Sequence, residues 1–337
     1  MSKIKIDFVI PWVNGSDPEW QDEFKNHSPN PDSCDARFER YRDWDLLKYW
    51  FRGVEKNAPW VNKIYFITWG HVPAWLNLNH PKLVVVKHED YIPAEYLPTF
   101  SSHPIELNMH RIRGLSERFV YFNDDFFLIN KVRPEHFFVN KLPCDMASLF
   151  DITSPDKVFE RVLKNNNDII NSHFDKRKVI DVNLSKWFNF NFGFNNFKTI
   201  SRLKNTKDCG IAFHHLPQSF LKSTLLDVWD NYHEIMDSTS RSKFRSVEDV
   251  NQYIFKQWQI CKGEFSPKNP KSFGIYVGIR DKTLLLANII LRSKFKSVVC
   301  LNDVDGLTDF YAAKELITNT FNKILPNESS FEVGIND

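Results

Sequence analysis

The sequence predicts an α/β protein with a Rossmann-like, mostly parallel sheet that is flanked by helices and interrupted by a mainly helical insertion. Two observations support this fold class. Over the first 130 residues, short β-rich runs alternate with helical patterns, which is typical of parallel sheets. From Pro217 to Ile260 the spacing of apolar residues becomes mostly helical.

The elements follow from local patterns. Strands are expected at the β-rich runs Ile4–Val9, Lys63–Thr68, Lys82–His88, Arg118–Phe122 and Ser297–Leu301. Helices are expected over Asp43–Asn57, His103–Arg113 and Asp309–Ile324. In the second helix, Ile105, Met109 and Ile112 recur at helical spacing, and Gly114 is placed to end it.

The middle of the chain, 151–210, is expected to be less regular. Asn165-Asn166-Asn167 predicts a turn or a helix end. The run 186–194 alternates aromatic residues with Asn, and we interpret it as a strand or as a loop flap over a cleft. Pro267–Pro270, with two prolines close together, predicts a loop.

Composition excludes several classes of protein. A formal net charge of +2, from 44 basic and 42 acidic residues, argues against a nucleic-acid binder. The five cysteines lie far apart without a CxxC pair, which indicates free thiols in a reducing compartment and no zinc site. The N-terminus lacks the apolar region of a signal peptide, and the apolar stretch Leu284–Leu291 is too short to span a bilayer. These features indicate a cytoplasmic protein.

Asn123-Asp124-Asp125 directly follows a predicted strand. Ligands of parallel sheets bind at the carboxyl ends of the strands, and adjacent carboxylates there provide the oxygen ligands that Mg²⁺ or Mn²⁺ prefers. A polar turn accounts for the same residues equally well. Spacing alone does not separate the two interpretations.

Asn14-Gly15-Ser16-Asp17-Pro18 follows the first predicted strand. Gly15 allows the backbone to approach a ligand. Ser16 or Asp17 also suits a helix cap, with Pro18 in the first turn. From the residues alone, the cap is the better interpretation.

Three further groups combine a chemical and a structural interpretation. His214-His215 provides a proton acceptor near neutral pH or a loop histidine satisfied by the backbone. Asn302-Asp303 follows a predicted strand and adds a carboxylate or forms a turn. Arg241 and Arg245 suit a phosphate clamp or a solvated helix face. Taken singly, each group favours the structural interpretation.

Long segments of the chain resemble the Stealth family of sugar-phosphate transferases, most closely the bacterial capsular polysaccharide phosphotransferases. The first block is IDFVIPWVNGSDP, from Ile6 to Pro18, and the second spans Arg42 to Leu128 and ends in VYFNDDFFL. The third begins at HLPQSFLKS and continues to KFRSVEDV, and the fourth is VCLND, from Val299 to Asp303. Segment 131–200 matches poorly, so we expect it to decide acceptor choice.

The resemblance implies a division of the chain. Residues 1–130 and 295–325 are expected to form a Rossmann-like (GT-A-like) nucleotide-sugar-binding catalytic core. Residues 131–294 are expected to complete the cleft and to contact the acceptor.

The resemblance also implies roles for particular residues. Asp124, Asp125 and Asp303 would hold Mg²⁺ or Mn²⁺. His215 is the first choice for the base and Asp125 the second, since the family pattern falls on His215 and not on His214. Arg245 and Arg111 would stabilise the phosphate. The residues expected to contact the nucleotide sugar are Asn14, Gly15, Ser16, Asp17, Asn123, His103 and Asn108.

The activity implied is transfer of a hexose-1-phosphate from a UDP-sugar to a hydroxyl of an acceptor sugar or growing capsular polysaccharide, with release of UMP. One alternative is a metal-dependent glycosyltransferase that releases UDP. The other is a non-catalytic carbohydrate-binding protein that uses Trp187 and its Phe neighbours as a sugar platform. The expected location is the cytoplasm at the inner face of the membrane, in peripheral association with a capsule export complex.

Overall fold

The computed structural model describes residues 4–28 and 42–334 of the 337-residue chain. Cys34 lies outside the described residues. The four described cysteines, Cys144, Cys209, Cys261 and Cys300, are buried free thiols.

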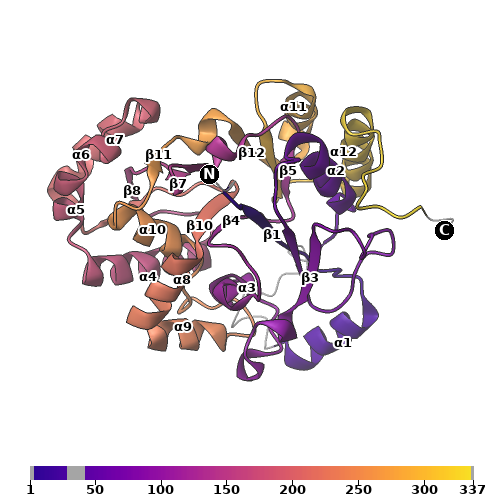
Figure 1. Cartoon of the computed structure of the whole chain (residues 1–337), viewed down its shortest axis with the longest axis horizontal. Helices are drawn as coiled ribbons and strands as arrows, with labels where there is room; N and C mark the ends of the chain where they lie inside the picture. The colour runs from indigo at the N-terminus through magenta and orange to yellow at the C-terminus, as the bar shows by residue number, and fades with distance from the viewer. Residues whose placement is uncertain (1–3, 29–41, 335–337) are drawn as a thin grey trace.

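A five-stranded sheet with the order β10-β4-β1-β2-β3 forms the centre of the molecule (Figure 1). Its strands are β1 (Asp7–Pro11), β2 (Ile64–Thr68), β3 (Leu83–Lys87), β4 (Arg118–Tyr121) and β10 (Gln218–Leu221). β1 pairs in parallel with β2 and β4, and β2 pairs in parallel with β3. β10 is antiparallel to β4. The predicted Rossmann-like, mostly parallel sheet is confirmed, and the sequence analysis did not anticipate β10.

Both faces of this sheet are buried. Side chains alternate along β1, so that Phe8 and Ile10 lie in one hydrophobic cluster and Val9 in another. The first cluster includes Trp50 of α2, and the second includes Leu107 of α3. Burial on both faces explains why the strands read as nearly continuous apolar runs.

After β4 the chain enters a second sheet, which has the strand order β12-β13-β5. It consists of β5 (Phe126–Leu128), β12 (Gly274–Ile279) and β13 (Val298–Asp303). β13 runs antiparallel to β5 with Cys300 opposite Phe126, and the Leu301 amide donates to the Asp125 carbonyl at 2.9 Å. This pairing brings the C-terminal part of the chain to the turn after β4.

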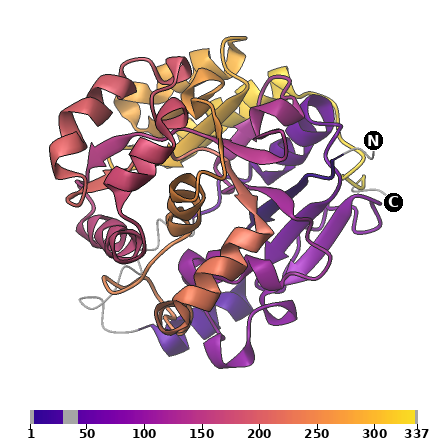
Figure 2. The same ribbon diagram turned by 60° about the vertical axis from the view of Figure 1, so that its left-hand side comes forward.

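Helices cover the sheets. Those of the first and last parts of the chain are α1 (Pro18–His27), α2 (Leu47–Asn57), α3 (Ser102–Leu107), α11 (Asp281–Arg292) and α12 (Phe310–Ile324). Those of the middle are α4 (Lys157–His173), α5 (Lys176–Val182), α6 (Leu184–Trp187), α7 (Asn195–Arg202), α8 (Lys222–Asn231), α9 (His233–Ser240) and α10 (Tyr253–Cys261). Figure 2 brings this helical half forward. Two small sheets lie within it, β11 (Ser266–Pro267) with β7 (Leu142–Asp145) and β6 (Phe138–Val139), and β8 (Leu149–Asp151) with β9 (Cys209–Ile211).

The helical insertion is confirmed, but its first half is more regular than expected. Asn165-Asn166-Asn167 lies inside α4, where Asn166 donates to Asn251 at 2.7 Å, so the predicted turn is wrong. The run 186–194 ends α6 and forms a 3₁₀ turn at Phe190–Phe192, and it contains no strand. Local asparagines favour turns, but in α4 tertiary partners override that preference.

Two helices in the first 130 residues are shorter than predicted. The expected helix Asp43–Asn57 begins only at Leu47. The expected helix His103–Arg113 is α3 followed by a 3₁₀ turn at Met109–Arg111, and Gly114 adopts a φ of 82° beyond it. The last predicted helix is confirmed as α12, capped by Asp309. Among the described residues, no helix is both long and apolar enough to cross a membrane.

Candidate active site

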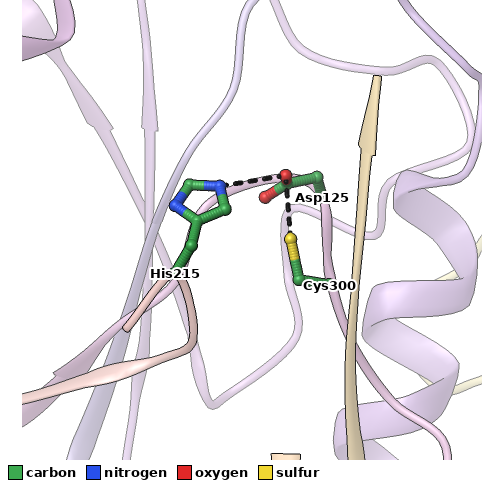
Figure 3. Close-up of side chains that lie close together, drawn as sticks. All are labelled: Asp125, His215 and Cys300. Carbon is green, nitrogen blue, oxygen red and sulfur yellow. Dashed lines mark hydrogen bonds and ion pairs between the residues drawn. The ribbon is translucent and has the colours of Figure 1, made fainter. Parts of the chain in front are cut away.

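Asp125 is the centre of a cluster of polar side chains that come from distant parts of the sequence. Its Oδ2 atom lies 3.3 Å from His215 Nε2 and accepts hydrogen bonds from Cys300 Sγ at 3.2 Å and from Asn302 Nδ2 at 3.1 Å. Figure 3 shows Asp125 between His215 and Cys300. Asp125 stands at the end of the turn after β4, and Cys300 and Asn302 are on β13.

His215 lies in the loop before β10 and is held by two aromatic rings. Its ring meets Phe126 edge-on at 5.0 Å and Tyr276 at 5.9 Å between centroids. Asn302 Nδ2 also lies 3.2 Å from Nε2. Nδ1 points away from Asp125 in Figure 3.

The Asp125–His215 pair has the electrostatics of an ion pair. Burial by itself would raise the pKa of Asp125, but the charge of His215 and the hydrogen bonds from His215, Asn302 and Cys300 lower the pKa below its ordinary value. Burial would lower the pKa of His215, but the charge of Asp125 raises it above its ordinary value. Each partner therefore stabilises the charged form of the other.

Asp124 and Asp43 add two carboxyl groups beside this pair. The pKa of Asp124 is raised to about 7, first by desolvation and then by the charges of Asp125 and Asp43. Asp124 is itself exposed to solvent on one side. The desolvation comes from the protein atoms that surround the rest of its carboxyl group. Asp43 accepts a hydrogen bond from Trp12 Nε1 at 3.2 Å, and burial raises its pKa. Sequence analysis placed Asp43 in a helix and missed it.

Glu106 is a buried carboxyl group near the site that sequence analysis also missed. It accepts a hydrogen bond from Tyr121 Oη at 2.9 Å. Burial raises its pKa to about 7, against the lowering effects of this hydrogen bond and of the charges of Arg245 and His215. Sequence analysis followed the spacing of Ile105, Met109 and Ile112, and Glu106 is not at one of those positions.

Arg245 is positioned beside Glu106 and His215 by a buried polar cluster. Its Nη2 donates to Ser102 Oγ at 3.0 Å. His103 Nδ1 lies 2.8 Å from Asp249 Oδ2, which also accepts the Ser246 amide at 2.9 Å. His103 thus anchors the loop that carries Arg245.

Three of the expected site residues make their described contacts elsewhere. Asp303 Oδ2 accepts two hydrogen bonds from Arg42, at 2.6 and 3.0 Å, and its neighbour Asn302 reaches Asp125 instead. Asn108 donates to Ser240 and accepts from Arg111 Nε at 3.0 Å, and Arg111 lies over the Trp229 ring. None of these contacts joins Asp303, Asn108 or Arg111 to the Asp125 cluster.

The segment Asn14–Asp17 forms the cap that the residues alone favoured, and it borders a recess. Asp17 Oδ1 accepts the Trp20 amide at 3.0 Å at the start of α1, and the Asn14 amide donates to His71 Nε2 at 2.7 Å. The recess, of about 570 Å³, lies at the carboxyl ends of β1, β2 and β3 and is lined by Asp17, Glu19, Glu23, Trp69, Gly70, His71, Lys87, His88, Glu89, Leu97, Pro98 and Thr99. We call it the first recess.

A second recess, of about 600 Å³, includes His215 in its wall. Its lining is Phe213, His214, His215, Leu216, Lys271, Gly274, Ile275, Tyr276 and Lys296. His214 is buried, and neither of its ring nitrogens has a hydrogen-bond partner among the described residues. A buried polar group without a partner calls for an explanation.

The cluster also offers atoms for a metal ion. One donor atom from each of Asp125, His215 and Cys300 lies within 4.8 Å of the others, and Asp125 Oδ1 is buried without a partner in the described part of the chain. Burial raises the pKa of Cys300 far above its ordinary value, so the thiol stays protonated and donates to Asp125. The atoms that suit a hard cation are therefore the carboxylate oxygens of Asp125 and Asp124.

The sequence matches known proteins over nearly its whole length. Residues 5–25 match Stealth protein conserved region 1, and residues 40–145 match conserved region 2. The chain is 41% identical to capsular polysaccharide phosphotransferase WcwK of Streptococcus pneumoniae, over 97% of this chain and 98% of that protein. It is 38% identical to receptor polysaccharide phosphotransferase WefC of Streptococcus gordonii, over 98% and 99%.

Exopolysaccharide phosphotransferase cps2G of Lactiplantibacillus plantarum is 36% identical, over 97% of this chain and 96% of that protein. Among solved structures, the galactosyltransferase LgtC aligns with a TM-score of 0.41 and 9% identity, over 94% of this chain and 95% of that one. The fold and site define a Rossmann-like protein with a carboxylate–histidine centre. The chain belongs to the Stealth family.

Proposed function

We propose that the protein transfers a hexose-1-phosphate from a UDP-sugar to a hydroxyl of an acceptor sugar or growing capsular polysaccharide, and releases UMP. The single observation that carries the proposal is the contact between Asp125 and His215 at the carboxyl end of a parallel sheet. The full-length similarity to polysaccharide phosphotransferases supports it.

The reaction forms one P–O bond and breaks another. The acceptor oxygen attacks the phosphorus that carries the donor sugar, and the P–O bond to UMP breaks. The anomeric C–O bond of the donor is untouched. The reactive form is the neutral imidazole of His215, with its Nε2–H donated to Asp125. Nδ1 of this form takes the proton of the acceptor hydroxyl, and Asp125 stabilises the imidazolium that forms. Asp125 is the second choice for the base.

The donor is proposed to lie across the ends of β1 and β4. Its nucleotide occupies the first recess, which Asp17, Trp69 and His71 line. The proposed contacts from Asn14, Gly15 and Ser16 come from the segment that leads to Asp17, where the Asn14 amide is hydrogen-bonded to His71. Asn123 and Arg245 lie toward the diphosphate, and the Arg245 fork neutralises phosphate charge. His103 acts through the loop of Arg245, while Arg111 and Asn108 support α3 from its Trp229 side.

We propose that Asp124 and Asp125 hold Mg²⁺ or Mn²⁺. The unpartnered Oδ1 of Asp125 supports this assignment. When bound, the ion would neutralise charge on the diphosphate and on the leaving UMP. The family resemblance also implied Asp303 as a ligand. Arg42 already pairs with its carboxylate at 2.6 Å, so we give Asp303 no direct part in holding the ion.

The acceptor sugar is proposed to occupy the second recess. Tyr276 offers a ring face, and His214 offers a donor and an acceptor for sugar hydroxyls. Burial, with the charges of Lys256 and Lys271, keeps the pKa of His214 well below its ordinary value, so the ring is neutral. A neutral imidazole has one N–H donor and one free acceptor. Residues 131–294 would thus contact the acceptor, as the division of the chain predicts.

The four buried free thiols support a reducing compartment. We therefore propose a cytoplasmic enzyme that works at the inner face of the membrane beside a capsule export complex.

The deciding experiment is a panel of UDP-sugars with a capsule-type acceptor, scored for the nucleotide released. UMP is expected. Release of UDP would identify a glycosyltransferase, and no turnover with any donor would favour a carbohydrate-binding protein. The sugar platform suggested for the latter cannot include Trp187, which is fully buried.

A further inference from the structure

Residues 190–200 expose an unusual amount of apolar surface. Phe190 is 99% exposed, Phe194 81%, Phe197 65% and Ile200 52%. We call these four residues the aromatic patch. The Phe194 and Phe197 rings lie 5.6 Å apart, and Phe194, Phe197 and Ile200 follow one another at three-residue steps at the start of α7 and along it. Figure 1 shows α7 at the rim of the helical half.

The segment beneath the patch is well packed. Trp187 and Phe192 are buried. On the inner side of α7, Thr199 Oγ1 accepts the Leu149 amide at 3.2 Å and lies 3.2 Å from Ser148 Oγ. The exposed rings are therefore the outer face of an anchored helix, and exposed apolar patches of this kind mark interaction sites.

The same part of the chain is strongly basic. Residues 176–207 contain eight Lys or Arg and one Asp, a formal charge of +7, whereas the whole chain carries +2. The rest of the chain therefore carries −5. Lys198, Lys204 and Lys207 are exposed and have no ion-pair partner among the described residues.

We infer that the aromatic patch docks the protein on an anionic lipid bilayer. The rings would enter the boundary between headgroups and acyl chains, and Lys198, Lys204 and Lys207 would face the lipid phosphates. Phe, Leu and Ile beside Lys and Arg are the composition of interfacial helices, and a basic segment is attracted to a negatively charged leaflet. The inference is independent of the phosphotransfer reaction.

The composition of the patch argues against a sugar platform. Tyr and Trp combine an apolar ring with a polar tip that can bind hydroxyls, but the exposed rings here are all Phe. The local charge argues for a partner with a dense negative surface. A bilayer with anionic headgroups meets both requirements.

The test uses the full-length protein and sedimentation with vesicles. Binding is expected to vesicles of phosphatidylglycerol and phosphatidylcholine, to weaken as salt is raised, and to be absent with phosphatidylcholine alone. The triple variant Phe190→Ser/Phe194→Ser/Phe197→Ser should bind at least tenfold more weakly. The variant Lys198→Gln/Lys204→Gln/Lys207→Gln should bind roughly a hundredfold more weakly, since each lysine near the surface contributes about a fivefold effect.

Two further variants make the test selective. Leu78→Ser/Leu226→Ser changes exposed apolar residues outside the patch and should leave binding unchanged. Leu285→Ser/Ile289→Ser changes a second exposed face, on α11. Thermal unfolding of every variant checks that it is folded.

Three outcomes would overturn the inference. One is loss of vesicle binding in the α11 variant together with normal binding in the Phe190/Phe194/Phe197 variant. A second is no binding to any vesicle, with the patch instead mediating self-association of the chain. The third is no vesicle binding but patch-dependent retention on an anionic polysaccharide.

Discussion

Asp125 and His215 stand 90 residues apart in the sequence, and their side chains meet with 3.3 Å between Oδ2 and Nε2. The contact exists because β10, which follows the histidine loop, pairs antiparallel with β4, which precedes the Asp125 turn. Each residue shifts the pKa of the other toward its charged form. This mutual stabilisation is the basis of the first prediction.

Asp125→Asn should keep the fold and lower kcat by about 10²–10⁴, the range of general acid–base effects. Asparagine fills the same space but cannot stabilise the imidazolium of His215. The measurement is UMP release under saturating donor, with His215→Ala as the parallel variant. Near-wild-type turnover in a folded Asp125→Asn protein would remove Asp125 from the mechanism.

His214→Ala should raise KM for the acceptor by about tenfold and change kcat little, because His214 touches the proposed acceptor recess and not the Asp125 cluster. His214→Gln, which keeps a donor and an acceptor, should restore part of the affinity. Initial rates at varied acceptor concentration separate the two parameters. A loss confined to kcat would contradict the assignment of the second recess to the acceptor.

Treatment with EDTA should abolish activity, and Mg²⁺ or Mn²⁺ should restore it. Asp124→Asn should weaken this reactivation more than Asp303→Asn, because Arg42 already occupies the Asp303 carboxylate at 2.6 Å. Activity measured against added metal concentration tests the order of the two variants. Full activity after exhaustive chelation would exclude the metal.

Glu106→Gln should make the protein more stable than wild type at pH 8 but not at pH 5. The folded-state pKa of Glu106 is raised from 4.5 to about 7 by burial, so the stability that the neutral acid allows is present below pH 4.5 and is lost as pH rises through 7. The expected difference at pH 8 is about 2–3 kcal/mol. Urea unfolding at both pH values measures it, and a constant difference would contradict the raised pKa.

Glu332→Gln should lower the free energy of unfolding by about 3–5 kcal/mol, the cost of breaking a buried ion pair. Glu332 Oε2 lies 2.6 Å from Arg52 Nη2, and both side chains are almost fully buried. The matched control is Asp22→Asn, which breaks an exposed pair with Lys25 and should change little. Equal effects of the two substitutions would show that the Arg52 pair does not anchor the C-terminal segment to α2.

Local pattern was enough to place most of the central sheet. The runs at residues 63–68, 82–88 and 118–122 contain β2, β3 and β4 almost residue for residue, because strands buried on both faces are continuous apolar runs. Local pattern failed in α4, where buried Asn166 has a partner on another element. It also failed at β10, whose four residues carry too short a signal to separate from the helices that follow.

The candidate site likewise contains residues that the sequence indicated and residues that only the structure revealed. Asp125 and His215 were named from the sequence, because their residue types and their place in long family-like blocks indicated chemistry. Asp43, Glu106 and Cys300 were not named as site residues, and Asn302 was named only as the neighbour of Asp303. Each of the four owes its role to residues that are distant in the chain. Asp303 and Asn302 are adjacent, and only the pairing of β13 with β5 decides which of them faces Asp125.

The sequence by itself determined the Rossmann-like sheet, the helical insertion and the two residues at the centre of the proposed chemistry, because apolar periodicity and motif order are local properties. The tertiary structure alone decided which carboxylates surround Asp125, where the two recesses lie and which aromatic rings stay in solvent. Those properties depend on strand pairing and burial, which join residues that no local pattern connects.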